Sequence, residues 1–140
     1  MARAQLAKEL VMVAKDETGL LGRITVALAQ HNIYIIHLCA SAEGGKATVR
    51  AVTRDSEKAK EALSYFVSEI KEREVVIVEF ENKVGTLAPV AKLLGNENIG
   101  IESVYGTSGD GFKIVGVFST QDNRRAAELI NRESGALGVT

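Results

Sequence analysis

Two short turns carry the residues of this sequence that are best suited to binding a small molecule. In the first turn Asp16 stands three residues before Gly19, and in the second Asn82 stands three residues before Gly85. Each turn would leave backbone N–H groups at a helix N-terminus, where the partial positive charge favours a carboxylate. An Asp or Asn oxygen can also accept hydrogen bonds from an ammonium group. These groups together suit the two ends of a zwitterionic amino acid.

The same residues also have a purely structural explanation. Gly19 and Gly85 can serve only to adopt a positive φ, and Asp16 and Asn82 only to cap the turn. Those tasks exist whether or not a ligand binds, so the sequence leaves both explanations open.

A second set of residues could bind a metal. His37 and Cys39 are two residues apart in a predicted strand and would share one face, and His31 lies near the end of the preceding helix. Two ligands do not make a metal site, and a small apolar Cys beside a hydrogen-bonded His is the commoner meaning. We therefore expect no metal and no other cofactor, with a metal-responsive protein using His37 and Cys39 as an alternative.

Catalysis has little support in the sequence. We find no Ser-His-Asp or Cys-His-Asn spacing, and both histidines lie close together. The acidic residues between positions 57 and 74 fall where a solvated helix and its exit would place them. We expect no catalytic residues and a protein that is not an enzyme.

Charge and composition narrow the class of partner. The 140 residues include 17 basic and 18 acidic ones, a net charge of -1, which gives no field to attract nucleic acid or an anionic membrane. Residues 1–9 lack a signal-peptide core and no run reaches transmembrane length. The single Cys39 excludes an internal disulfide framework and fits a reducing compartment. The expected location is the cytoplasm.

The chain resembles itself at an offset of 66 residues. From Leu10/Val76 to Leu63/Leu129 the alignment needs no gap and contains nine identical pairs, which fall on turn glycines and periodic apolar positions. We therefore predict two tandem repeats, residues 8–72 and 73–140. Each would bury little surface alone, so we expect a shared core or association.

Each predicted repeat contains the same order of elements. An apolar strand, the glycine turn and a one-faced helix precede a hairpin and a second helix, for which Ser56 and Asp122 are the predicted N-caps. The order predicts an α+β fold of two ferredoxin-like βαββα(β) repeats, with antiparallel sheets covered by helices on one face. The segment between Phe66 and Val75 can form either a helix tail or a short fourth strand, and residues 136–140 are the candidate fourth strand of the second repeat.

The two turns resemble a known family. Residues 16–21 and 82–87 are similar to the D/N-x-P-G-x-L turn of ACT domains, and residues 32–35 and 98–101 resemble the family's second strand, which begins x-N-I. The resemblance covers residues 10–130, twice over. It implies an allosteric regulatory protein that binds an amino acid or related carboxylate at repeat or subunit interfaces. It also implies a homodimer or higher homo-oligomer, with a partner enzyme or the assembly itself as the receiver of the signal.

The resemblance also suggests ligand-binding residues, and departures from the family pattern make the two sites unequal. Thr18 and Val84 replace the usual proline, and side-chain specificity is expected from positions such as Ile36, Glu102 and Val104. The second turn is ranked above the first. A ligand-free oligomerisation module is the main alternative. The residues expected to bind ligand are Asn82, Gly85, Thr86, Leu87, Asp16, Gly19, Leu20, Tyr34 and Gly100.

Overall fold

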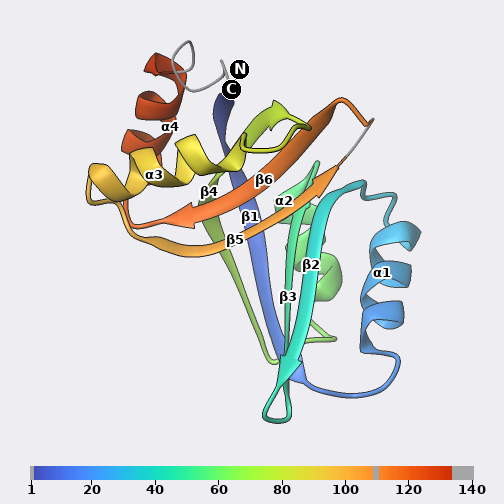
Figure 1. Ribbon diagram of the computed structural model, residues 1–140. Helices are drawn as coiled ribbons and strands as arrows, with labels where there is room; N and C mark the ends of the chain where they lie inside the picture. The colour runs from blue at the N-terminus through green and yellow to red at the C-terminus, as the bar shows by residue number, and fades with distance from the viewer. Residues whose placement is uncertain (1, 109–110, 134–140) are drawn as a thin grey trace. The chain divides into compact units, whose positions relative to one another are not determined.

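The computed structural model describes residues 2–108 and 111–133, and it shows an α+β protein (Figure 1). The chain divides into two compact units, a first unit of Lys8–Arg73 and a second unit of Met1–Ala7 with Glu74–Thr140. Among the described residues, no helix is long and apolar enough to cross a bilayer. The elements are β1 (Arg3–Lys15), α1 (Leu20–Gln30), β2 (Ile35–Glu43), β3 (Lys46–Thr53), α2 (Ser56–Leu63), β4 (Glu69–Glu81), α3 (Leu87–Asn96), β5 (Ile101–Ser108), β6 (Lys113–Thr120) and α4 (Asn123–Arg132).

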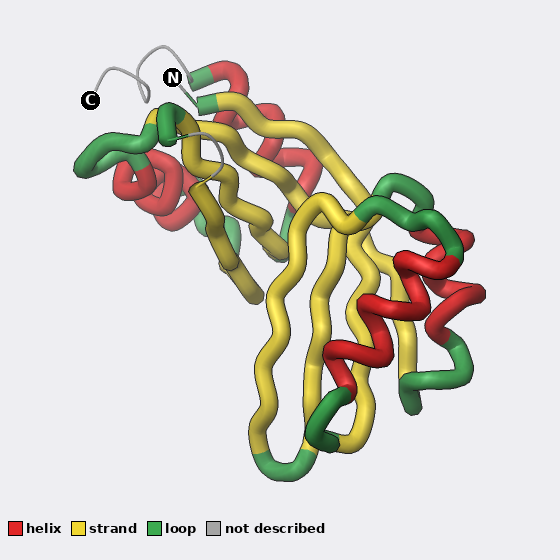
Figure 2. The backbone as a smooth tube through the Cα atoms, turned by 90° about the vertical axis from the view of Figure 1, so that its right-hand side faces the viewer, coloured by secondary structure: helices red, strands yellow, loops and turns green. Residues whose placement is uncertain are grey.

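In the first unit the strand order is β2-β3-β1-β4, and β3 runs antiparallel to both of its neighbours. Leu10 and Met12 of β1 alternate with residues of the opposite face, so they point toward α1 and α2. Ile24 and Leu28 of α1 and Leu63 of α2 complete this core. Figure 2 shows both helices on one face of these strands.

In the second unit the order is β1-β4-β6-β5, with β6 antiparallel to β4 and β5. Val76, Val78 and Phe80 of β4 form a core with the buried faces of α3 and α4. Both units thus have the ferredoxin-like arrangement that the sequence predicts.

The fourth strand of each unit comes from a part of the chain that continues into the other unit. Residues 69–73, the start of β4, close the first unit, inside the segment where a short strand was one of two predicted options. Residues 3–7, the start of β1, close the second unit, and the sequence analysis missed them. The other candidate, residues 136–140, lies outside the described residues.

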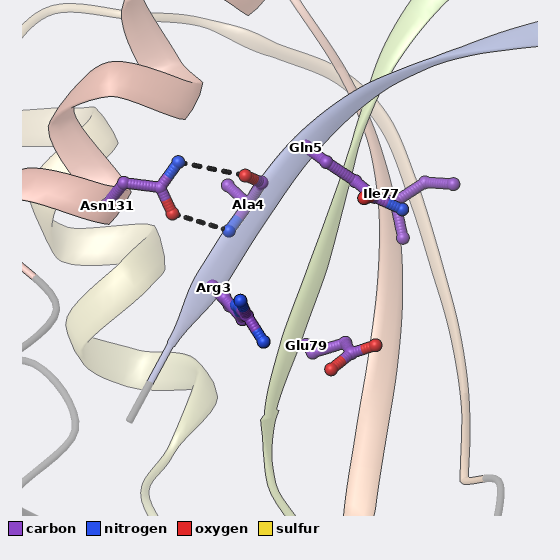
Figure 3. A pocket seen from close by; sticks show the side chains of 6 residues that line it. All are labelled: Arg3, Ala4, Gln5, Ile77, Glu79 and Asn131. Carbon is purple, nitrogen blue, oxygen red and sulfur yellow. Dashed lines mark hydrogen bonds between the residues drawn. The ribbon is translucent and has the colours of Figure 1, made fainter.

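An asparagine side chain fastens the N-terminal strand to the second unit (Figure 3). The Asn131 Oδ1 atom accepts a hydrogen bond from the Ala4 backbone N–H at 2.8 Å, and Asn131 Nδ2 donates one to the Ala4 carbonyl at 2.8 Å. The amide group thereby imitates a neighbouring strand. This contact satisfies the Ala4 backbone groups on one edge of the strand, whereas β4 is the neighbouring strand on the other.

The Asn-Ile pair after each first helix has a local structural reason. Asn32 and Asn98 adopt φ values of 56° and 59°, a left-handed conformation that asparagine tolerates better than most residues. The next N–H groups, of Ile33 and Ile99, donate back to carbonyls of the helix. These residues therefore end α1 and α3 and aim the chain into β2 and β5.

The ungapped offset of 66 residues is wrong for the part of each unit that follows the hairpin turn. Met12 pairs with Val49 in the first unit, while Val78 pairs with Gly116 in the second, so β3 and β6 correspond at an offset of 67. The second hairpin contains one additional residue. The same shift corrects a predicted N-cap, because Asp55 caps α2 through the Lys58 N–H, as Asp122 caps α4.

Candidate functional site

The two glycine turns have nearly the same backbone conformation. Gly19 has φ 90° and Gly85 has φ 87°, values that side chains other than glycine adopt only with strain. A Cβ atom on Gly85 would meet nothing within 4 Å, so the conformation rather than crowding requires glycine there. The structural explanation for these glycines is therefore correct, and it leaves room for a ligand as well.

The helices that follow the turns differ from the other two helices at their N-termini. Asp55 and Asp122 accept hydrogen bonds from the first turns of α2 and α4. In the part of the chain that the structure describes, no side chain caps α1 or α3. Uncapped N–H groups of a first turn need water or a ligand as partner. The turn helices thus keep donors available beside the glycines.

A hollow of about 700 Å³ lies between the second turn, the start of α3 and the strands β5 and β6. Its size is within the range of small-molecule pockets. The lining is mostly apolar and includes three of the predicted ligand-binding residues, Gly85, Thr86 and Leu87. The full lining is Phe80, Lys83, Gly85, Thr86, Leu87, Ala88, Ala91, Val104, Tyr105, Gly106, Ile114, Gly116 and Phe118.

Three residues with little side-chain bulk open this hollow. Gly106 of β5 and Gly116 of β6 are register partners, so two neighbouring positions of the sheet carry no side chain. The Thr86 hydroxyl turns back to donate to the Glu81 and Lys83 carbonyls, at 2.8 and 3.1 Å. The hydroxyl is therefore satisfied within the turn.

The first unit has a smaller hollow in the corresponding place. It measures about 310 Å³ and is lined by Gly19, Leu20, Ala40 and Val49 among others. Ala40 and Val49 are register partners, as Gly106 and Gly116 are in the second unit. Leu20 belongs to the apolar core and is only 6% exposed. Larger side chains thus occupy the space that is open in the second unit.

The charges at the two turns also differ. Lys83 lines the second hollow, and its ammonium lies 2.7 Å from the Glu81 carboxylate, which lowers the pKa of Glu81 below its usual value. At the first turn Glu17 lines the hollow and pairs with Arg23 at 3.3 Å. The second hollow therefore carries a cation where the first carries an anion.

The structure gives Asn82 and Asp16 different surroundings. Asn82 Nδ2 donates to the Gly111 carbonyl at 3.2 Å, and its backbone N–H donates to the Phe112 carbonyl. It holds the hairpin against the turn and does not line the hollow. Asp16 lines the first hollow. The contact with Gly111 uses Nδ2, whereas a ligand ammonium would bind Oδ1, so the predicted contact of Asn82 with a ligand does not compete with it.

Tyr34 and Gly100 lie away from the turns of their own units. Each precedes the start of its strand, β2 or β5, whereas the turn lies by the end of that strand, where the Asp16 N–H donates to the Gly45 carbonyl. Nine residues of extended strand span about 30 Å. Tyr34 instead stacks on the Arg54 guanidinium, 4.5 Å from the ring centre, and a Cβ on Gly100 would meet the Gln121 side chain.

Residues that the sequence analysis did not assign form much of the second hollow. Lys83, Ala91, Gly106, Gly116 and Phe118 all line it. Isolated glycines inside strands are a signal of close approach or missing bulk, and Gly106 and Gly116 carry that signal. Val104, one of the positions expected to set specificity, lies in the lining, whereas Tyr34 and Gly100 do not.

His37 and Cys39 share a face of β2, as their spacing predicts, because they pair with Val52 and Arg50 of β3. Burial lowers the pKa of His37 below 6.5. Within residues 2–108 and 111–133, no group of three His, Cys, Asp or Glu side chains could hold a metal ion. His31 hydrogen-bonds through Nδ1 to the Ala27 carbonyl at the end of α1.

Comparison with known proteins bears on the fold. No protein-family model and no curated protein matches the chain. A solved structure of a protein from Bacteroides thetaiotaomicron has 25% identity and a TM-score of 0.84, over 94% of this chain and 90% of that one. The ligand-free regulatory subunit of aspartate kinase from Thermus thermophilus has 14% identity and a TM-score of 0.69, over 94% and 96%. A structure of aspartokinase alpha and beta subunits has 17% identity and a TM-score of 0.68, over 95% of this chain and 97% of that one. This chain therefore shares its fold with these subunits of aspartate kinase.

Proposed function

We propose that the protein is a non-catalytic regulatory protein that binds an amino acid or a related small carboxylate in the hollow of the second unit. The observation that carries this proposal is the position of the hollow, which opens directly on the glycine turn and the uncapped start of α3. A carboxylate there meets N–H donors and the positive end of the helix. The aspartate kinase structure from Thermus thermophilus named above, which is a regulatory subunit by name, agrees with this function.

Lys83 adds a cation to the same rim. Its ion pair with Glu81 holds the ammonium close to the turn. Because both side chains are exposed, this pair is weak, and a ligand carboxylate can replace Glu81 as the partner of Lys83. The first hollow carries Glu17 at the equivalent position and would repel the same group. We assign the ligand to the second unit for this reason.

The proposal includes association between copies of the chain. Val84 is fully exposed, Phe112 is 81% exposed, and both lie by the second turn. Apolar side chains this exposed are costly in water, and a second copy would cover them. Ligand binding beside them can then act on assembly, or on a partner enzyme, if the ligand has different affinities for the two states. We also propose that the two units descend from one duplicated ACT-like repeat, as their common order of elements suggests.

Calorimetric titration with the twenty amino acids tests the function. We expect saturable binding of at least one of them to the full chain, and a shift in sedimentation coefficient when it binds. Silence across the whole set, with the corresponding 2-oxo acids included, would contradict the proposal.

A pair of charge exchanges between the turns tests the position of the site. Lys83→Glu places the first unit's charge at the second rim, and we expect about a tenfold loss of affinity, because reversal of one rim charge is worth about 1.4 kcal/mol. The matched control, Glu17→Lys, should leave affinity unchanged. The reverse result would place the ligand in the first unit.

A further inference from the structure

We propose that the hollow under α3 selects ligands with a branched-chain or aromatic side chain, and that Thr86, Gly106 and Gly116 determine this selectivity. The inference rests on the proposed function, because it describes the side-chain end of the same ligand. It follows from the chemistry of the cavity and from the contrast with the first unit.

The walls of the hollow are chemically uniform. Val104, Ile114 and Phe118 come from the helix-covered face of the strands, and Leu87 and Ala91 come from α3. Lys83 is the one charged residue among the described residues that line it, and it lies at the turn. A polar or charged ligand side chain placed against these walls would lose its hydration without a partner, whereas an apolar one gains from burial.

The empty space has an identifiable origin in the sequence. The first unit has Leu20, Ala40 and Val49 where the second has Thr86, Gly106 and Gly116. The three replacements remove six side-chain carbon atoms and add one oxygen, which leaves room for a branched aliphatic side chain, and the hollow of about 700 Å³ is more than twice the 310 Å³ of the first unit. A ligand side chain of that kind would replace the packing that the first unit makes with its own residues.

Gly116 has a second task that fixes one wall. A Cβ atom on Gly116 would lie 2.8 Å from Cε1 of Phe118, so the missing side chain lets the Phe118 ring lie over the strand. The ring is 1% exposed and presents an aromatic surface to the hollow. Aromatic and branched side chains pack well against such a surface.

Among the residues that the structure describes, the lining of this hollow contains no acidic or amide side chain to accept hydrogen bonds from the ammonium of an amino acid, because Asn82 lies outside it. The chemistry that the hollow recognises is therefore a carboxylate with a bulky apolar side chain. Two sources provide it, an α-amino acid and the corresponding 2-oxo acid. Titrations with both forms of one side chain distinguish these sources.

Calorimetry with L-leucine, L-phenylalanine, L-serine, L-lysine and L-aspartate tests the selectivity, with 4-methyl-2-oxopentanoate as the second source. We expect the bulky apolar ligands to bind at least tenfold more tightly than serine, from burial of a side chain of about leucine size. Tighter binding of serine, lysine or aspartate would overturn this inference and leave the proposed function standing. Absence of binding by all of them and by every other amino acid would overturn both.

Substitutions that introduce residues of the first unit test which positions determine the selectivity for the ligand side chain. Thr86→Leu should weaken leucine binding at least tenfold and reduce the preference for leucine over alanine. Gly106→Ala adds one carbon whose nearest neighbour is the Val115 carbonyl oxygen at 3.3 Å, and it should weaken binding severalfold with the fold intact by circular dichroism. Gly22→Ala, which adds a carbon only to the first hollow, is the matched control and should bind as the wild type does. Unchanged selectivity in both Thr86→Leu and Gly106→Ala would overturn the inference.

Discussion

The two units use the same turn and build different surroundings for it. Gly19 and Gly85 differ by 3° in φ, and both precede an uncapped helix. Beneath the first turn Leu20 and Val49 narrow the hollow to about 310 Å³, and beneath the second it measures about 700 Å³. The turn is thus a requirement of the fold, whereas the residues under it decide what the unit can hold.

A second difference lies where the first and fourth strands meet. In the first unit Glu9 is 1% exposed and pairs with Arg73 at 2.8 Å. The corresponding residues of the second unit are Val75, which is fully buried, and Ala7. A similar position is therefore stabilised by an ion pair in one unit and by apolar residues in the other.

The largest expected effect comes from breaking that ion pair. Arg73→Ala removes the ion pair of a buried carboxylate, and we expect a loss of about 3 kcal/mol in the free energy of unfolding. This value is at the low end for buried pairs because the Arg73 side chain is 31% exposed. Urea denaturation measures it, and a loss under 1 kcal/mol would show that water replaces the arginine.

The double variant Glu9→Val/Arg73→Ala gives the first unit the apolar side chains of Val75 and Ala7 and tests whether they can replace the ion pair. Apolar replacement of both members of a buried pair is often neutral or stabilising. We expect recovery of most of the stability lost in Arg73→Ala. If the double variant is less stable than Arg73→Ala, the two units are not interchangeable at this position.

The sequence could predict the elements and the turns because those depend on local periodicity and on glycine. It could not predict the strand at residues 3–7, because its partners, β4 and Asn131, are distant in sequence, Asn131 by 127 residues from Ala4. It misplaced the cap of α2 because an inserted residue in the second hairpin shifts the alignment, so that Ser56 replaced Asp55.

Much of the hollow escaped prediction for a different reason. Thr86 looks like a ligand-binding residue because it follows the glycine, yet its contribution is the absence of a leucine side chain. Gly106 and Gly116 become neighbours only through the register of β5 and β6. A cavity that arises from small residues on neighbouring strands can be predicted from the sequence only when the pairing of the strands is known.

A smaller effect is expected from Gly19→Ala and Gly85→Ala. Neither new Cβ has a neighbour closer than 3.6 Å, so each variant should lose about 1–2 kcal/mol from left-handed strain alone. We expect the two losses to agree within 0.5 kcal/mol, about the error of independent sites, in urea denaturation. A cost at Gly85 well above that at Gly19 would contradict the view that the turns do the same structural work.

The smallest expected effect concerns pH and the first unit alone. His37 corresponds to Ser103 in the second unit, and the His37 Nδ1 atom is buried without a hydrogen-bond partner among the described residues. Burial lowers the pKa of His37 below 6.5, so the unfolded chain binds a proton more readily than the folded chain does. Stability should therefore fall as the pH drops below 6.5 and level off below the folded-state pKa.

His37→Ser, which borrows the residue of the second unit, should flatten that part of the pH dependence and leave stability near pH 8 little changed. Urea denaturation of both proteins between pH 5 and pH 8 measures the two slopes. If the free energies of unfolding of the two proteins depend equally on pH, protonation of His37 does not oppose folding, and water reaches its ring in the folded protein. The helix-free face of β2 would then accommodate a protonated His37 with no loss of stability, like a neutral serine at this position.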